Sequence, residues 1–233
     1  MENHGLPTGI DHLKLIGAGG TTTRQNTFKG IGTDTDELSV FGTSLCALYQ
    51  AATCHRKCHR GSHILESLSG RSYNLACAAF TLLTLGYYDE ALNLVRSMGE
   101  IGNLIMLSVV NKDAIKKWIE SDRSTRLKDF SPMKVRKALE AKGDAPLIAE
   151  YDWYIDLCEK YTHPTPGTRP NMHTGQKSHA GGVFQKDGFD LAIGELSTIT
   201  ISIAMLICRY FEFDDLFAEI VGLVRGLDDA QSS

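Results

Sequence analysis

Apolar residues recur at three- and four-residue spacing from about Asp36 to the C-terminus, which is the periodicity of amphipathic α-helices. Asp36 is a suitable N-cap, and the pattern that it begins continues to about Leu68. Ser69 can begin a second helix, which ends at Gly86. Further helices are predicted over 87–110, 113–121, 131–142, 146–161, 190–211 and 214–227. The pattern therefore indicates an all-α fold, a multi-helix bundle formed by residues 36–233.

Two stretches do not follow the helical period. Residues 197–203 alternate polar and apolar side chains and are rich in β-branched residues, as strands are. Their flanks favour helix and no partner strand is evident nearby, so we expect a helix here as well. Residues 1–35 are rich in Gly and Thr and contain few large apolar side chains. We therefore expect an irregular N-terminal arm, with at most one short strand over 13–16.

The composition is typical of a folded globular domain, with 42% hydrophobic and 22% charged residues. The formal net charge of -4 excludes a basic field around the whole molecule, so we expect no binding to duplex DNA. One long uncharged stretch, 72–88, falls short of the roughly 18 apolar residues of a membrane span. The first residues contain no apolar targeting segment, and the six cysteines form no dense framework. We therefore expect a cytoplasmic protein with reduced thiols and no membrane partner.

The predicted helix over 87–110 carries one polar stripe on an otherwise apolar surface. The stripe consists of Asp89, Asn93, Arg96, Glu100 and Asn103, which share one helix face. Arg96 and Glu100 are four residues apart and can form an ion pair. The stripe is either a solvated edge or one wall of an internal polar cleft, in which Arg96 would need Glu100 as its partner. The apolar residues expected to be buried include Leu92, Val95, Ile105 and Val109.

A long irregular stretch over 161–188 contains three of the six prolines and three of the eight histidines. Pro164 and Pro166 end the preceding helix just after His163. A helix C-terminus favours a positively charged imidazole, so His163 is a candidate proton donor or acceptor, unless it only caps the last carbonyls. Long irregular loops in compact domains are commonly functional. This stretch is therefore the second candidate site segment.

Together the two segments predict one site. Arg96 would hold an anionic group, Glu100 would orient Arg96, and His163 would donate or accept a proton. The side chains expected to bind ligand around these three candidate catalytic residues are Asn93, Tyr161, Arg169 and His173. The loop over 165–188 is locally basic and is expected to lie over the cleft. An anionic small molecule or RNA is the partner that these charges favour.

Cysteines and histidines gather over residues 54–63, where the sequence reads CHRKCHRGSH. On a helix, one face would carry His55, His59 and His63, and one would carry Cys54 and Cys58. Zinc prefers four nitrogen or sulfur ligands, and no second pair of this kind completes the set. We therefore favour a solvated basic helix end over a zinc-dependent protein, and assign no metal ligands and no cofactor.

Two motifs in this order resemble a group of bacterial helical proteins. One motif is Leu94-Val95-Arg96-Ser97-Met98-Gly99-Glu100, and the other is a helix end that includes Tyr154, Tyr161, His163 and Pro164. Over residues 68–211 the chain is similar to the HEPN-like helical bundles. The resemblance implies a bundle that is commonly dimeric and that, in its nuclease members, cuts RNA without metal through an Arg-x4–6-His motif. Such nucleases act as toxins or in phage defence.

The sequence departs from that nuclease motif at the expected place. No arginine lies within six residues before His163, whereas Arg56 and His63 have the required spacing but lie in the first predicted helix. We therefore favour a cytoplasmic, homodimeric binding or accessory protein of a prokaryotic defence or stress system, with a polar cleft for an anionic ligand. The alternative is a metal-independent HEPN-type ribonuclease. In it, His163 or His63 would act as acid–base and Arg96 or Arg56 would stabilise the phosphate.

Overall fold

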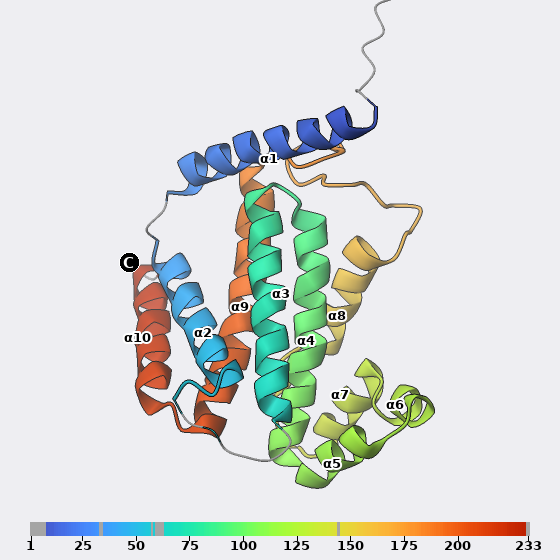
Figure 1. The fold of residues 1–233 in the computed structure, drawn as a ribbon, viewed down its shortest axis with the longest axis vertical. Helices are drawn as coiled ribbons and strands as arrows, with labels where there is room; N and C mark the ends of the chain where they lie inside the picture. The colour runs from blue at the N-terminus through green and yellow to red at the C-terminus, as the bar shows by residue number, and fades with distance from the viewer. Residues whose placement is uncertain (1–7, 33–34, 57, 59–62, 144, 232–233) are drawn as a thin grey trace, which may run out of the picture.

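The computed structural model describes residues 8–32, 35–56, 58, 63–143 and 145–231. Within these ranges the chain forms α-helices and one π-helical turn, η1, and no strand (Figure 1). The bounds are α1 Ile10–Ile31, α2 Asp36–Ala52, α3 Ile64–Thr84, α4 Tyr88–Val110, α5 Lys112–Glu120, α6 Arg123–Asp129, α7 Pro132–Glu140, α8 Tyr151–Leu157, η1 Cys158–Thr162, α9 Lys186–Phe211 and α10 Asp214–Gln231. The all-α multi-helix bundle predicted from the periodicity is therefore confirmed.

Helices α3, α4 and α9 run side by side through the bundle, and α2 and α10 close one side of it (Figure 1). α4 is buried because apolar residues cover most of its surface. Leu92, Val95 and Ile105 are fully buried, as predicted, whereas Val109 near the end of the helix is only half-buried. Burying one such side chain contributes roughly 1.5–3 kcal/mol. The core therefore forms where the periodic apolar faces meet.

The prediction of helix over residues 197–203 is confirmed, because this stretch lies inside α9. Ile199, Ile203 and Ile207 follow one another at four-residue spacing and face the core. The hydroxyl of Thr200 donates to the carbonyl of Leu196 at 2.6 Å, so a β-branched polar residue is satisfied within the helix. α9 is also the one described helix long and apolar enough to cross a membrane, and over half of that stretch is buried in the bundle. Packing of this kind is that of a core helix.

The predicted helix over 36–68 contains α2, a break and only the start of α3, and the predicted helix start at Ser69 is wrong because α3 continues through that residue. α2 ends at Ala52, and α3 begins at Ile64. Cys54 and His63, at the two ends of the connection, have left-handed backbone conformations, with φ of 51° and 49°. Right-handed helix cannot pass through such residues, and this is why the helix breaks here although the periodic pattern continues. The expectation that the cysteines and histidines over 54–63 share helix faces is therefore wrong. One of the histidines of this stretch, His59, lies outside the described residues.

The expectation of an irregular arm over 1–35 is wrong for most of its length. Residues 10–31 form α1, which lies across one end of the bundle, and the suggested strand over 13–16 is part of it (Figure 1). Thr27 donates its hydroxyl to Thr23 O at 3.0 Å and to Thr84 O at 3.1 Å, so it joins α1 to α3. Tertiary contacts of this kind stabilise a Gly-rich helix whose own propensity is low.

The remaining helices lie beside one end of α4. α5 and α7 occupy the stretches predicted to be short helices, whereas α6 was not expected. A small second core joins α7 to the end of α4, through Leu107, Val135 and Leu139. α8 begins at Tyr151, later than predicted, and continues into η1. The segment formed by α8 and η1 runs along α4, and its path decides which of the predicted site residues lie close together.

Candidate functional site

The polar stripe of α4 faces another part of the chain. Asn103, which is 6% exposed, donates from Nδ2 to Ala149 O at 2.8 Å. Its Oδ1 accepts from the backbone N–H groups of Ile148 at 2.9 Å and Ala149 at 3.1 Å. These N–H groups are therefore satisfied outside a helix, which explains why α8 begins only at Tyr151. The stripe is a partly buried seam between α4 and the later segment, and its polar groups are largely paired there.

Three side chains in the middle of the seam are all hydrogen-bonded to one another: Arg96, Glu100 and Tyr154. Arg96 forms an ion pair with Glu100, and its side chain is 16% exposed. Arg96 Nη1 donates to the hydroxyl of Tyr154 at 3.0 Å, and that hydroxyl lies 3.0 Å from Glu100 Oε1. Burial disfavours the charge of Arg96, but Glu100, Tyr154 and Cys158 together outweigh burial and raise the pKa of Arg96. Because Glu100 compensates this charge, the group joins α4 to α8.

Asn93 joins the stripe to the end of η1. Its Oδ1 accepts from the hydroxyl of Thr162 at 3.0 Å. The next residue, His163, donates its backbone N–H to Cys158 O at 2.8 Å, the five-residue separation typical of a π-helix. The side chain of His163 is exposed and has no hydrogen-bond partner among the described residues. The structure therefore places His163 at the helix end, as predicted, but not among the residues that line the pocket described below.

At the N-terminal end of the stripe, Asp89 holds the loop that follows η1. Its Oδ1 lies 2.8 Å from His173 Nε2, and its Oδ2 accepts from the backbone N–H of Asn171 at 2.7 Å. A carboxylate only accepts, so the proton in the first bond is on Nε2. His173 has a side chain 7% exposed, and its Nδ1 has no partner among the described residues. Asp89 therefore fixes both the orientation and the tautomer of His173.

Two further residues, neither of them among the predicted site residues, hold this loop in place. Asn171 has a φ of 50°, and its Nδ2 donates to Gly86 O at 2.7 Å. The side chain of Gln185 accepts from the backbone N–H of Thr174 at 2.9 Å and donates to Asn171 O at 2.9 Å. Asn tolerates the left-handed region, which is a weak local signal for a turn at this position. Nothing in the local sequence marks Gln185, because its partners lie 11 and 14 residues away.

A cavity of about 580 Å³ opens beside this arrangement. Its polar lining consists of Asp89, Glu159, Lys160, Tyr161, Arg169 and His173, with the hydroxyls of Thr165 and Thr168. Three of the four predicted ligand-binding residues, Tyr161, Arg169 and His173, therefore lie together. Arg96, Glu100, Asn93 and His163 do not line it. The site predicted as one cleft is thus a pocket at one end of the stripe and a paired seam beyond it.

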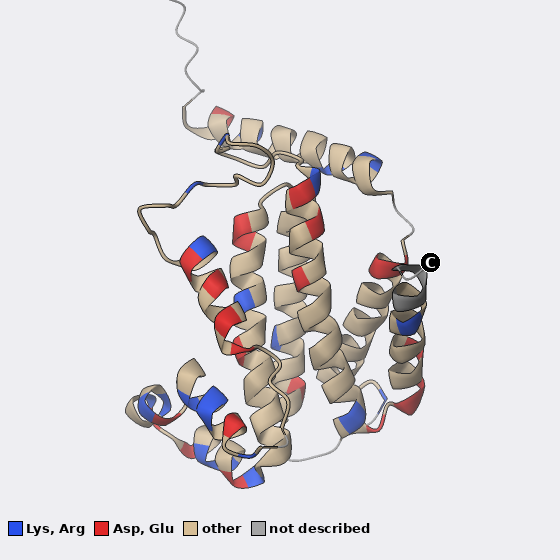
Figure 2. Cartoon of the chain, turned by 180° about the vertical axis from the view of Figure 1, so that it is seen from behind, with Lys and Arg blue, Asp and Glu red and all other residues tan. Residues whose placement is uncertain are grey.

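The charges around the pocket are unevenly compensated. Acidic residues recur along α8 and η1, and Lys160 pairs with one of them, Asp156, at 2.7 Å (Figure 2). Arg169 donates only to the main-chain oxygens of Pro166 and Thr168, and has no carboxylate partner among the described residues. Glu159 also lines the pocket and has no ion-pair partner within the described part of the chain. A ligand would therefore meet the guanidinium of Arg169 and the carboxylate of Glu159, neither of them in an ion pair within the described residues, and beside them Asp89, which is hydrogen-bonded to His173.

Tyr161 forms one wall of the pocket. Its ring stacks near His173, with centroids 6.2 Å apart and planes at 19°. Burial, and after it the charge of Asp89, raises the pKa of Tyr161 to about 12. The phenol is therefore a neutral hydrogen-bonding group at physiological pH, and it cannot serve as a base there.

A second cavity, also of about 580 Å³, lies between α8 and α9. Its lining is mainly apolar, and its charged members are the carboxylates of Glu150, Asp190 and Glu195. Trp153 donates from Nε1 to Glu195 Oε2 at 2.6 Å across it. Because this cavity contains no cation, it does not suit the anionic ligand expected from the sequence.

Comparison with known proteins assigns this chain to no family. No family model, no curated protein and no solved structure matches the chain at the significance required. The resemblance to HEPN-like bundles therefore remains a prediction, and the arguments about function rest on the pocket.

Proposed function

We propose that this chain is a helical-bundle binding or accessory protein, and that the pocket beside the start of α4 binds a small anionic ligand. The observation that carries the proposal is Arg169. Its guanidinium lines the pocket with no carboxylate partner among the described residues, and guanidinium groups bind carboxylate and phosphate with charge-assisted hydrogen bonds.

The ordered neighbours of Arg169 support the same proposal. Asp89 holds His173 in one orientation, and Nδ1 of that imidazole, which has no partner among the described residues, is available for a hydrogen bond with a bound ligand. Tyr161 supplies a neutral hydroxyl. The carboxylate of Glu159 repels a second anionic group, so a ligand with one anionic group and neutral polar groups suits the pocket best. Arg96 and Glu100 would then position α8 through Tyr154, and with it the η1 turn that follows, and would not touch the ligand.

Titration calorimetry with inorganic phosphate and with adenosine monophosphate tests this function. Arg169→Ala is expected to weaken binding at least about tenfold, since a charge-assisted hydrogen bond contributes about 1.5–3 kcal/mol. Lys177→Ala is the matched control, because Lys177 is an exposed cation of the same loop that does not line the pocket. Binding that responds equally to both substitutions would show general electrostatic attraction and would contradict the proposal.

The Asp89–His173 pair favours one second candidate, a metal-independent ribonuclease. A histidine held by a carboxylate next to an arginine can transfer a proton while the arginine stabilises the phosphate. Incubation with single-stranded RNA in the presence of a chelator separates the candidates. Cleavage that is lost in His173→Ala would favour the nuclease. Binding without cleavage would favour the binding protein. Loss of cleavage in His163→Ala but not in His173→Ala would place the chemistry at the exposed helix end.

A further inference from the structure

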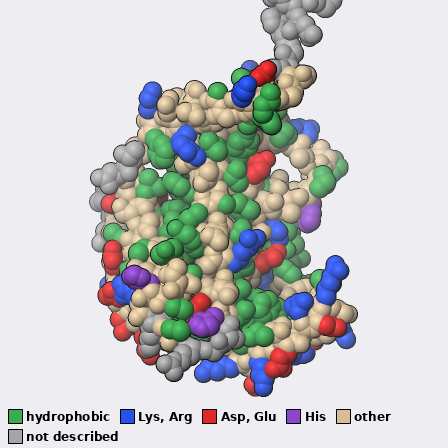
Figure 3. Space-filling model, viewed as in Figure 1, with side chains coloured by type: hydrophobic (Ala, Val, Ile, Leu, Met, Phe, Trp, Pro, Cys, Tyr) green, Lys and Arg blue, Asp and Glu red, His purple; other side chains and the backbone are tan. Residues whose placement is uncertain are grey.

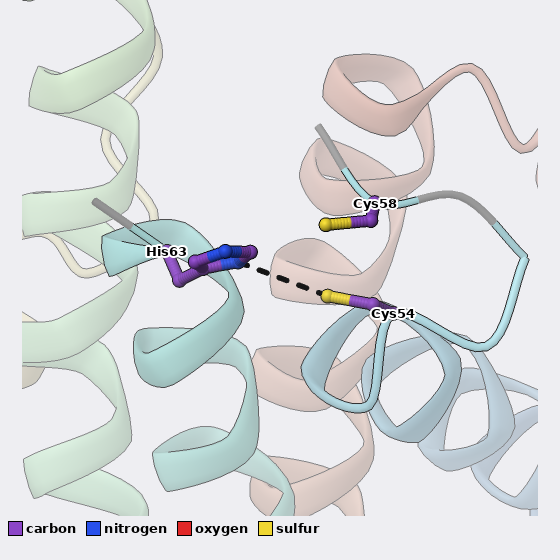
Figure 4. A group of neighbouring side chains, drawn as sticks. All are labelled: Cys54, Cys58 and His63. Atoms are coloured by element: carbon purple, nitrogen blue, oxygen red, sulfur yellow. Dashed lines mark hydrogen bonds between the residues drawn. The ribbon is translucent and has the colours of Figure 1, made fainter. Parts of the chain in front are cut away.

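The connection between α2 and α3 brings three metal-ligating side chains together. Cys54 follows the end of α2, His63 precedes the start of α3, and Cys58 lies between them (Figure 4). Cys54 is half-buried, whereas Cys58 and His63 are exposed. Histidine side chains reach the surface at the end of the molecule where α2 and α3 are joined (Figure 3). The cluster exists because the helix breaks at these residues, and it has no counterpart on a continuous helix.

The distances within the cluster suit one tetrahedral ion. His63 Nδ1 lies 3.8 Å from Cys54 Sγ, and one ligand atom from each of the three residues lies within 4.8 Å of the others. Ligands bound at about 2.0–2.3 Å to a tetrahedral zinc ion are about 3.3–3.8 Å apart. Figure 4 shows the imidazole of His63 and the two thiols pointing toward one another from the facing ends of the connection. A small contraction would therefore bring all three to bonding distance of one ion.

A buried carboxylate beside the cluster is the second observation. Glu66, on the first turn of α3, has a side chain only 9% exposed, and its Oε1 lies 3.3 Å from His63 Nδ1. His63 is its one side-chain partner among the described residues. A buried carboxylate needs a compensating positive charge or hydrogen bonds. Nδ1 is also the nitrogen that faces Cys54, so an ion bound there would replace the Glu66 hydrogen bond and would supply the positive charge that this buried carboxylate needs.

We propose that Cys54, Cys58 and His63 bind one divalent metal ion of the zinc class, and that the buried carboxylate of Glu66 beside them contributes negative charge that stabilises the ion. Two thiolates and one imidazole are ligands that zinc prefers, and calcium and magnesium disfavour. Water completes the tetrahedron, because Cys58 and His63 are both exposed to solvent. The ion joins the end of α2 to the start of α3, across a connection that carries little other local structure among its described residues.

Metal titration of the full-length protein tests the proposal. The protein is kept reduced, stripped with a chelator and titrated with Co²⁺. We expect one equivalent to produce the visible bands of a tetrahedral ion and the ultraviolet thiolate-to-cobalt charge-transfer band, and one equivalent of Zn²⁺ to abolish both. X-ray absorption of the zinc form is expected to show two sulfur and two lighter ligands. Absence of the charge-transfer band in the wild type would overturn the proposal.

Substitutions locate the ion. Cys58→Ser alters an exposed side chain, so the bundle still folds, and it is expected to weaken Co²⁺ binding more than about tenfold. Cys46→Ser is the control, because Cys46 is an exposed cysteine of α2 outside the cluster, and it is expected to leave the affinity unchanged. Equal affinity in Cys58→Ser and wild type would overturn the site. A disulfide between Cys54 and Cys58, detected by mass spectrometry of protein purified under reducing conditions, would overturn it as well.

Glu66→Gln tests the contribution of the buried carboxylate. Because the glutamine keeps the shape but removes the charge, the tetrahedral Co²⁺ spectrum should persist while the affinity falls more than about tenfold. Circular dichroism of the metal-free variant controls for loss of fold. An affinity equal to that of the wild type would overturn the role assigned to Glu66.

Discussion

At the residue scale, single polar side chains decide how irregular backbone packs against α4. Asn103 alone satisfies three backbone groups of residues 148 and 149, and Asp89 receives both His173 and the N–H of Asn171. An unpaired buried polar group costs about 1–3 kcal/mol, so each of these side chains makes one backbone path better than its alternatives. The same residues that predicted a functional stripe therefore also position the loop.

Tyr161 makes the stability of the protein change with pH in the alkaline range. Burial and Asp89 raise the pKa of Tyr161 in the folded state to about 12, whereas a tyrosine in an unfolded chain titrates near about 10. Between these values the folded state binds more protons than the unfolded state, so the free energy of unfolding decreases as the pH rises. The contribution of Tyr161 is complete below about pH 10 and is lost as the pH rises through about 12.

We therefore expect urea unfolding at a series of pH values from about 9 to 12 to show decreasing stability, with a shallower decrease in Tyr161→Phe. Tyr151→Phe is the control for loss of a tyrosine as such, because that ring is 51% exposed on the neighbouring α8. Identical pH dependence in Tyr161→Phe and in the wild type would contradict the buried, neutral phenol.

At the element scale, α4 carries two glycines where other chain segments come close to its axis. A Cβ at Gly99 would lie 2.7 Å from the ring of Trp153, and one at Gly102 would lie 2.5 Å from Ile148 Cγ2. Any larger side chain at these positions would force Trp153 or Ile148 to shift. The small residues therefore let the segment before α8 lie directly on α4, within reach of Asn103.

Gly102→Ala is expected to destabilise the protein by about 1–3 kcal/mol, because overpacking outweighs the gain in helix propensity. Gly42→Ala is the matched control on α2. No heavy atom would lie within 4 Å of its Cβ, so it is expected to stabilise by about 0.5–1 kcal/mol. Chemical denaturation of both variants measures the difference. A stabilising effect of Gly102→Ala would show that the close approach is absent in solution.

At the scale of the whole molecule, α1 lies across the end of the bundle and is attached by its C-terminal half. Thr23 donates to Gly182 O at 3.0 Å, Thr27 bonds to α3, and Gly30 faces the ring of Phe184. The N-terminal half exposes large apolar residues: Ile10 is 63% exposed, Leu13 62% and Ile16 51%. The two halves of this helix therefore contribute unequally to stability.

Deletion of residues 1–20 is expected to leave cooperative unfolding intact. It should lower the free energy of unfolding by about 1 kcal/mol or less, because the described residues of this stretch are mostly exposed. Deletion of residues 1–31 is the comparison. It removes Thr23 and Thr27 as well, and leaves two backbone carbonyls without their partners, each worth about 1–3 kcal/mol. Thermal unfolding of both forms measures the effect. Loss of cooperative unfolding in the shorter deletion would indicate that α1 exchanges between the subunits of an obligate dimer.

The periodic pattern determined the elements whose stability comes from one continuous apolar face. Leu92, Val95 and Ile105 placed α4 in the core, and Ile199 and Ile203 keep α9 helical despite their β-branched neighbours. The pattern also put Asp89 on the face where the loop now binds. Such features are local, because each helix buries its own stripe wherever its neighbours lie.

Only the tertiary structure decided the features that depend on residues far apart in the sequence. Asp89 meets His173 across 84 positions, and Thr23 meets Gly182 across 159. Neither contact has a local signal, so the pocket could not be separated from the paired seam around Arg96, and α1 could not be recognised as a helix. The break after Ala52 is of the same kind. Two left-handed residues, Cys54 and His63, interrupt a pattern that is locally helical, and only the resulting fold brings their side chains together.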